Sequence, residues 1–182
     1  HHLVGVFGGQ ARLGTHGVSS MFSKAARDLR EMPLPSIVSG DSKTPREWRG
    51  GNSMHTRNLL LDNGYEYDSD TYDDELPYWL KVGNRQQLIV PYSVVHNDVR
   101  FARQGMTSGD EYETYIKNAV QCVLEEDPPR MLSFGLHNRI IAHPGRALGL
   151  ARVLDWLASQ PRVWVTRRVD IARHWKKVHP AK

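Results

Sequence analysis

The sequence feature that most constrains the fold is a regular alternation of strand-like and helix-like segments from Trp48 onward. Short apolar, β-branched runs predict buried strands, and longer segments with apolar residues at helical spacing predict helices. The predicted strands are 88–95, 131–136 and 163–165, and the predicted helices are 55–63, 110–126, 144–159 and 169–175. Strands that alternate with helices of this length are typical of parallel sheets. The sequence therefore predicts an α/β fold.

The first 45 residues have a different character. They are rich in Gly, Ser and Pro, and only 20–31 has the apolar spacing of a helix. This segment contains too few apolar residues for a core of its own. We expect residues 1–45 to form an atypical, loosely ordered N-terminal segment and residues 46–182 to form the folded domain.

The composition excludes several classes of protein. The 182 residues carry a formal net charge of +4, but the basic residues are scattered, which argues against a nucleic-acid binder. No apolar run reaches the roughly 20 residues of a membrane span, and no signal peptide is visible. Cys122 is the only cysteine and lies in an apolar phrase, so we expect a buried thiol and no disulfide. These observations predict a soluble cytoplasmic protein, and a homo-oligomer is compatible with them.

Carboxylates and aromatic rings are concentrated in residues 65–79. Asp68 and Asp70 begin a run of five acidic residues, and Trp79 ends a series of five aromatic ones. Carboxylates beside rings suit an acid with a raised pKa or the binding of a polar, ring-shaped substrate. The alternative is a solvated acidic loop over packed aromatic side chains.

Two further phrases place polar residues after predicted strands. His137 directly follows the strand at 131–136, where α/β folds present catalytic groups, and its imidazole could protonate a leaving nitrogen. A structural histidine bonded to a backbone carbonyl is the alternative. After the strand at 88–95 come Asn97, Asp98 and Arg100, which could bind a carbonyl or ureido group. An ion pair between Asp98 and Arg100 that only shapes the loop is the alternative there.

The histidines give no positive sign of a metal site. None of the nine forms the i, i+4 pair that places two imidazoles on one helix face, and no His-Glu-x-x-His motif is present. We therefore expect no metal ligands and no cofactor.

Together, these phrases resemble the cofactor-independent allantoinases of the polysaccharide deacetylase (NodB-homology) superfamily. The resemblance is carried by Tyr-Asp-Ser-Asp and Leu-Pro-Tyr-Trp within 67–79, Pro-Tyr-Ser and Asn-Asp-x-Arg-Phe within 91–101, Gly-Leu-His-x-Arg at 135–139, Pro-Gly-Arg at 144–146 and the segment 162–175. The match runs from about Trp48 to Trp175. It implies a distorted barrel of parallel strands surrounded by helices, of which this chain has the C-terminal part and lacks the N-terminal strands.

The resemblance also implies the chemistry and the site. The family hydrolyses carbon–nitrogen amide bonds in N-acetyl sugars or in the ring of allantoin. By motif, His137 matches the late histidine that acts as the general acid, and Asp68 and Asp70 match the acidic motif that lines the pocket, so the resemblance implies His137, Asp68 and Asp70 as the catalytic residues. The predicted substrate-binding residues are Trp48, Arg57, Trp79, Asn97, Asp98, Arg100 and Arg139.

Three functional hypotheses follow because two motifs of the family depart from its pattern. The early Asp-Asp pair of the deacetylases has no counterpart before Asp68, and of their Ser/Thr-His-x-x-x-His metal motif only Thr15-His16 is present, with Ser20 in place of the second histidine. The first hypothesis is an allantoinase-like hydrolase of a ureide, which needs no metal. The second is a metal-dependent deacetylase of N-acetylated carbohydrates, and the third is a non-catalytic remnant of the fold.

Overall fold

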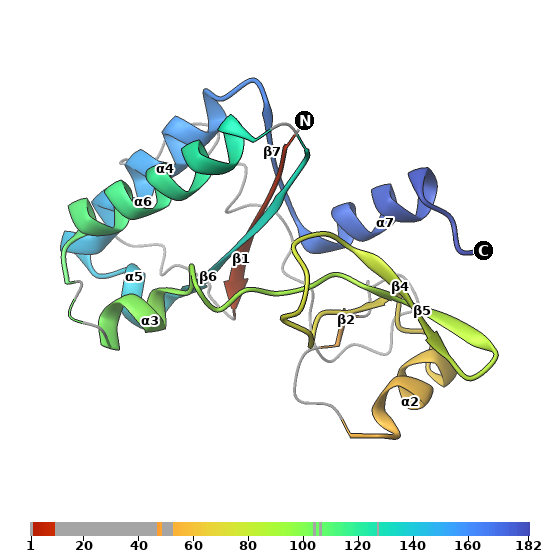
Figure 1. The fold of residues 1–182 in the computed structure, drawn as a ribbon. Helices are drawn as coiled ribbons and strands as arrows, with labels where there is room; N and C mark the ends of the chain where they lie inside the picture. Colours follow the sequence, from red (N-terminus) through yellow and green to blue (C-terminus); the bar gives the residue numbers. More distant parts are fainter. Residues whose placement is uncertain (1, 10–46, 49–52, 104, 106, 127) are drawn as a thin grey trace. The chain divides into compact units, whose positions relative to one another are not determined.

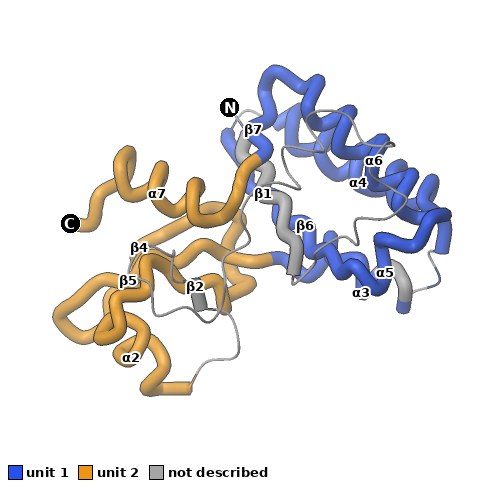
Figure 2. The backbone as a smooth tube through the Cα atoms, turned by 180° about the vertical axis from the view of Figure 1, so that it is seen from behind, with its two compact units in different colours: residues 1–34, 93–165 blue, residues 35–92, 166–182 orange. Residues whose placement is uncertain are grey.

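The computed structural model describes residues 2–9, 47–48, 53–103, 105, 107–126 and 128–182. Helices and strands alternate along the described chain, as the sequence predicts for an α/β protein (Figure 1). The chain divides into two compact units, 1–34 with 93–165 and 35–92 with 166–182 (Figure 2). The predicted helix at 20–31 and the predicted boundary after residue 45 lie outside the described residues, so both stay predictions.

The sheet of unit 1 is built around a strand that the sequence analysis missed. This strand, β1 (His2–Gly9), lies between β6 (Met131–His137) and β7 (Val163–Thr166). β1 and β6 are parallel, with Leu3 opposite Met131 and Gly9 opposite His137. The apolar run Leu3-Val4-Gly5-Val6-Phe7 was a strand signal, although Gly5 and the two glycines that follow the run obscured it.

Two long helices cover this unit and begin close to where the sequence predicts. α4 (Gly109–Glu125) starts at a capping box, in which the Ser108 side chain accepts from the Glu111 amide and the Glu111 side chain accepts from the Ser108 amide. α6 (Pro144–Ala158) has proline in its first turn, where the missing N–H donor costs nothing. Both predicted helices are thereby confirmed. Two short helices, α3 (Asp98–Arg103) and α5 (Asn138–Ile141), complete the unit.

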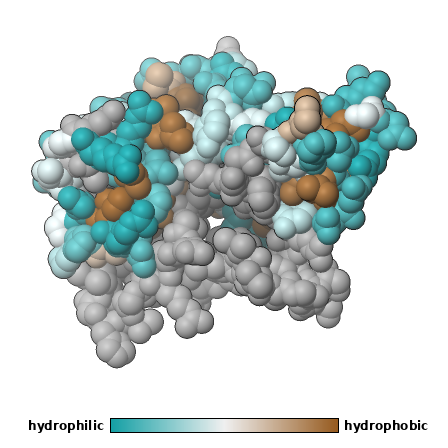
Figure 3. All heavy atoms as spheres, turned by 90° about the horizontal axis from the view of Figure 1, so that it is seen from below, coloured by the Kyte–Doolittle hydropathy of each residue, from teal (hydrophilic) through white to brown (hydrophobic). Residues whose placement is uncertain are grey.

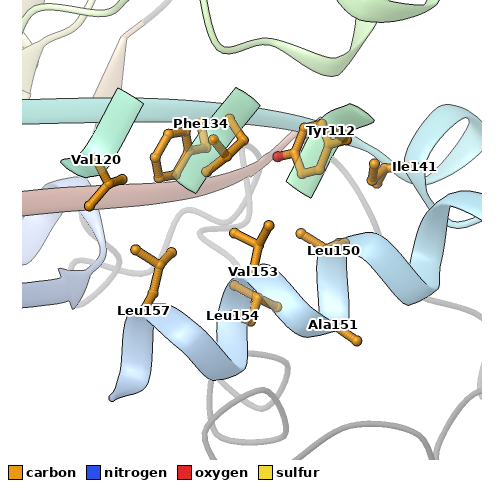
Figure 4. Packing of buried hydrophobic residues seen from close by; sticks show 10 residues of the cluster. Tyr112, Val120, Phe134, Ile141, Leu150, Ala151, Val153, Leu154 and Leu157 are labelled. Atoms are coloured by element: carbon orange, nitrogen blue, oxygen red, sulfur yellow. The ribbon is translucent and has the colours of Figure 1, made fainter. Parts of the chain in front are cut away.

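The core of unit 1 forms where α4 and α6 pack against β6. Leu150, Val153 and Leu157 of α6 face the side chains of the other elements (Figure 4). The buried members of the cluster are Tyr112, Ile116, Val120, Phe134, Ile141, Leu150, Ala151, Val153, Leu154 and Leu157. Burial of this apolar surface, at roughly 25 cal/mol per Å², is the main force that holds the two helices on the strand ending at His137.

Glycines allow α4 and α6 to approach each other closely. A Cβ atom on Gly149 would overlap the backbone carbonyl of Gly109 and lie 2.6 Å from its Cα atom. A Cβ atom on Gly109 would lie 2.7 Å from the carbonyl oxygen of Gly145. Only glycine therefore fits at the crossing point of these two helices.

Unit 2 contains a four-stranded sheet in the order β2 (Glu47–Trp48), β3 (Tyr67–Asp68), β5 (Arg85–Ile89) and β4 (Tyr78–Val82). The pairs β2–β3 and β3–β5 are parallel, whereas β4 and β5 form an antiparallel hairpin. Gly83 has a φ of 63° in the hairpin turn, a conformation that favours glycine. α2 (Thr56–Asp62) and α7 (Arg168–Val178) are the helices of this unit, and both match predicted ones.

Two predictions were wrong in detail. The strand predicted at 88–95 is β5 at Arg85–Ile89, and Val94 and Val95 are exposed. Pro91 has no backbone N–H and so cannot continue the ladder, while the Gly83-Asn84 turn indicates the hairpin that precedes it. Cys122 is exposed on α4 because it lies on the face away from Tyr112, Ile116 and Val120.

On the face of the molecule that Figure 3 shows, the described residues are mostly hydrophilic. Seen from below, hydrophobic residues form separate small patches among hydrophilic ones (Figure 3). In the part of the chain that the structure describes, no helix is both long and apolar enough to cross a membrane.

Candidate active site

The most specific polar arrangement in unit 1 joins Asp98 to His137. The Oδ1 atom of Asp98 lies 2.6 Å from the ring Nδ1 of His137, and its Oδ2 atom accepts a 2.6 Å hydrogen bond from the His137 backbone N–H. The Asp98 side chain is buried, with 1% exposed, whereas 26% of the His137 side chain is exposed. One carboxylate therefore holds both the backbone and the ring of the histidine, and no described residue is hydrogen-bonded to the ring Nε2.

Local structure explains why these two residues meet. Asn97 forms a parallel bridge with Gly135, two residues before His137 on β6. The Asn97 side chain also accepts a 2.9 Å hydrogen bond from the Val99 N–H and thereby caps α3, whose first residue is Asp98. The carboxylate is thus delivered to the end of β6 by a helix start that is fixed to the same strand.

This arrangement decides between two of the sequence alternatives. Both carboxylate oxygens of Asp98 are bonded to His137, so the ion pair with Arg100 that would only shape the loop is not formed; Arg100 is exposed on α3. His137 has an aspartate rather than a backbone carbonyl at Nδ1, which is the pattern of catalytic histidines held in one tautomer. Sequence reasoning named both residues but did not pair them, because they are 39 positions apart.

His96 does not join this group, although the sequence placed it in the same loop. Its ring is buried against Phe134, at 5.6 Å between centroids, and against Tyr115, at 5.7 Å. Burial lowers the pKa of His96, and its Nδ1 has no hydrogen-bond partner among the described residues. His96 is therefore a core residue that anchors the turn leading to Asp98.

The remaining polar residues near the end of β6 have separate roles. Arg139 is exposed on α5. Arg146, from the Pro-Gly-Arg phrase, donates to the carbonyl oxygens of Thr107 and Ile140 at 3.0 and 3.1 Å. Its guanidinium thus links α5 to the loop before α4.

A second polar group lies in unit 2 and contains the other predicted site residues. Asp68, at the end of β3, is fully buried; its Oδ2 accepts a 3.2 Å hydrogen bond from the Arg57 Nε, and its Oδ1 accepts one from the Asp70 N–H at 2.8 Å. Burial raises the pKa of Asp68, against the opposing effects of the Asp70 amide and of Arg57. Asp70 itself is half-buried.

The two predicted tryptophans are less informative. The Trp79 indole N–H donates a 2.7 Å hydrogen bond to the carbonyl oxygen of His179, so this donor is already used inside unit 2. Trp48 lies in β2, and its side chain is outside the description. The prediction that the unit 2 residues share one pocket with His137 stays a prediction, since each group is defined within its own unit.

A metal site of the deacetylase type does not fit the described residues. Among them, no three His, Cys, Asp or Glu side chains are grouped so that they could hold a metal ion. The half-motif Thr15-His16 lies outside the described residues. The arrangement at Asp98 and His137 instead suits proton transfer by the imidazole.

Comparison with known proteins agrees with the sequence resemblance. No family model matches the chain. A putative polysaccharide deacetylase of Schizosaccharomyces pombe is 35% identical over 165 residues, which cover 80% of this chain and 52% of that protein. The chain thus spans about half the length of the curated relative that it matches.

Solved structures give the same answer. A probable polysaccharide deacetylase from Pseudomonas aeruginosa PAO1 is 41% identical with a TM-score of 0.69, over 76% of this chain and 49% of that one. The PuuE allantoinase is 42% identical with a TM-score of 0.69, over 76% of this chain and 48% of that one. A putative polysaccharide deacetylase from Mycobacterium smegmatis, 24% identical with a TM-score of 0.62 over 76% of this chain and 51% of its own, shows the shared fold.

These matches define the class of the chain as an α/β protein with the polysaccharide deacetylase fold. In sequence and fold, the chain is similar to proteins named as polysaccharide deacetylases and to a protein named as an allantoinase. The resemblance inferred from the motifs is confirmed.

Proposed function

We propose that this chain carries the proton-donating part of a hydrolase that cleaves carbon–nitrogen amide bonds, with His137 as the general acid. The observation that carries the proposal is the double contact of Asp98 with the backbone and the ring of His137. The relatives named as polysaccharide deacetylases and as an allantoinase support this class of reaction.

In this proposal, each atom of the pair has a distinct task. A carboxylate accepts hydrogen bonds, so we assign one ring proton to Nδ1, facing Asp98, and the transferred proton to the opposite ring nitrogen, Nε2. An amide nitrogen leaves slowly as an anion, and protonation by Nε2–H as the C–N bond breaks removes that barrier. Before this step, water adds to the carbonyl carbon and loses a proton to solvent, and the C–N bond then breaks to give a carboxylate and a neutral amine or urea nitrogen. Asp98 balances the positive charge of the doubly protonated ring until Nε2 has given up its proton.

For the substrate, we favour a ureide ring of the allantoin type, because the PuuE allantoinase is among the similar structures. An N-acetylated carbohydrate is the second candidate, because the other relatives are named as polysaccharide deacetylases. Arg57, Trp79 and Arg139 stay candidates for binding either substrate. Asp70 stays a candidate for a second catalytic carboxylate.

The proposal is tested by assaying the chain with allantoin and with di-N-acetylchitobiose, each with and without a chelator. Chelator-resistant hydrolysis of allantoin is the expected result. Replacement of His137 by Ala should lower kcat by about 10²- to 10⁴-fold, the usual contribution of a general acid. The exposed His143 provides the matched control, and His143→Ala should leave kcat unchanged.

Other outcomes would favour the competing hypotheses. Acetate release from the sugar that is lost on chelation would support the carbohydrate deacetylase. A folded chain that hydrolyses neither compound would contradict the proposal and favour the non-catalytic remnant.

A further inference from the structure

The carboxylate of Asp68 in unit 2 is enclosed by protein groups. Its side chain is 0% exposed, and each of its two oxygens is used once: Oδ1 by the Asp70 N–H at 2.8 Å and Oδ2 by the Arg57 Nε at 3.2 Å. The backbone of β3 pairs with β2 on one side and with β5 on the other, and the Val90 N–H, just after β5, donates to the Asp68 carbonyl oxygen. A carboxylate so placed is poorly suited to take a proton from a water molecule or to touch a substrate.

A buried carboxylate requires compensation. Removing an ion from water costs several kcal/mol unless hydrogen bonds or an opposite charge replace the lost solvent. Arg57 supplies the opposite charge, and the Asp70 amide supplies a second donor. Through these two contacts, Asp68 holds the Asp70 backbone and the Arg57 side chain in place. Of the two partners, Arg57 is the one that offers a side chain for ligand binding.

Arg57 reaches solvent from the first turn of α2. Its side chain is 29% exposed, and only Nε is used in its hydrogen bond to Asp68. None of the described residues accepts a hydrogen bond from its two Nη groups. A guanidinium whose Nε is anchored presents its Nη donors in a fixed plane, which suits the paired oxygens of a carboxylate or the carbonyl oxygens of an amide or ureide.

A second side-chain interaction in unit 2 joins Tyr78 to Asp73. The phenol of Tyr78 donates to both carboxylate oxygens of Asp73 at 3.0 Å. Burial and Asp73 raise the pKa of Tyr78, whereas Arg57 and Thr71 act in the opposite direction. The positive charge of Arg57 thus acts on the Tyr78 hydroxyl, whose pKa is raised overall.

We propose that Asp68 is a positioning residue that aims Arg57, and that the Arg57 Nη groups bind a carbonyl or carboxylate oxygen of the substrate. This role replaces the catalytic role that the acidic motif predicts for Asp68. The claim that Arg57 binds the substrate rests on the proposed amide hydrolysis. The claim that Asp68 positions Arg57 does not depend on it.

A double-mutant cycle, measured on turnover of allantoin, tests whether Arg57 binds the substrate and Asp68 acts through it. Arg57→Ala and Asp68→Asn should each raise KM by roughly 10-fold or more, with a smaller change in kcat. Because Asp68 acts through Arg57, Asp68→Asn should have little further effect in the Arg57→Ala background. A kcat loss of 10²-fold or more from Asp68→Asn in both backgrounds would overturn the proposal and restore the catalytic role.

Asp62→Asn is the matched control because it removes another aspartate paired with an arginine. The Asp62–Arg85 pair is exposed, at 2.7 Å, so its loss should leave both kinetic constants unchanged. If Asp68→Asn fails to fold, Arg57→Lys provides the second variant, since it keeps the charge but loses the anchored Nε–H. An unchanged KM in Arg57→Lys would overturn the proposal.

NMR separates failure of this proposal from failure of the proposed function. In ¹⁵N-labelled protein, the Arg57 Nε–H signal should exchange slowly with water, and it should be lost in Asp68→Asn but retained in Asp62→Asn. This result stands even if the chain hydrolyses nothing. Rapid exchange of that signal in the wild-type chain would refute the positioning role, whatever the activity.

Discussion

Replacement of Gly149 by Ala should destabilise the protein through the crossing of α4 and α6. The new Cβ atom would overlap the carbonyl group of Gly109 and lie 2.6 Å from its Cα atom, whereas carbon atoms pack best at about 3.5–4.0 Å. The helices would have to separate by about 1 Å. The obstacle is backbone, which cannot turn away as a side chain can.

The size of the effect follows from two opposing contributions. Overpacking of this kind costs about 3 kcal/mol, the upper part of the usual range. Alanine gains about 1 kcal/mol over glycine in a helix interior, which leaves a net loss of about 2 kcal/mol. For a chain of this size, the Tm should fall by roughly 4–8 °C, measurable by calorimetry or by circular dichroism.

Gly145 supplies the control one turn earlier on the same helix. A Cβ atom there would meet no atom within 4 Å. Gly145→Ala should therefore leave stability unchanged or raise it by about 0.5 kcal/mol. Equal Tm values for the two variants would refute the close-contact explanation and show that α4 and α6 adjust freely.

Two further stability predictions come from unit 1. Ser108→Ala removes the N-cap of α4 and should lower the free energy of unfolding by about 1 kcal/mol, seen in urea titrations; an unchanged midpoint would contradict the role of the capping box. Burial lowers the pKa of His96, so the unfolded chain takes up a proton near pH 6.5 before the folded chain does. Stability should therefore fall as the pH drops below about 6.5. His96→Phe should reduce this loss of stability at low pH. If the variant loses as much stability as the wild-type chain when the pH drops, His96 is excluded as the cause.

The sequence predicted the long elements well because their signals are local. The helix at 109–125 has an apolar face and follows a capping serine, and the helix at 144–158 has an apolar face and a proline in its first turn. Signals spread over distant segments were missed. β1 becomes recognisable as a strand through its pairing with β6, more than 120 residues later, and the β4–β5 hairpin depends on a Gly-Asn turn inside a polar phrase.

The candidate site also combines local signals with contacts between distant segments. The motifs singled out His137 at the end of a strand and Asp98 in the segment that follows another, but their pairing depends on the parallel bridge between Asn97 and Gly135. The burial of individual side chains is the second property that the sequence did not reveal. It places the ring of His96 in the core against Phe134 and Tyr115, and it places the Asp68 carboxylate out of reach of solvent.

The central claim, that Asp98 holds the ring of His137 for proton transfer through Nε2, is tested most directly by the tautomer of that ring. In ¹⁵N-labelled protein at a pH where His137 is neutral, the account predicts a proton on Nδ1, with a strongly downfield signal that disappears in Asp98→Asn. Turnover in that variant should fall by about 10³- to 10⁴-fold. A neutral ring protonated on Nε2 in the wild-type chain, or turnover that is unaffected by Asp98→Asn, would contradict the account.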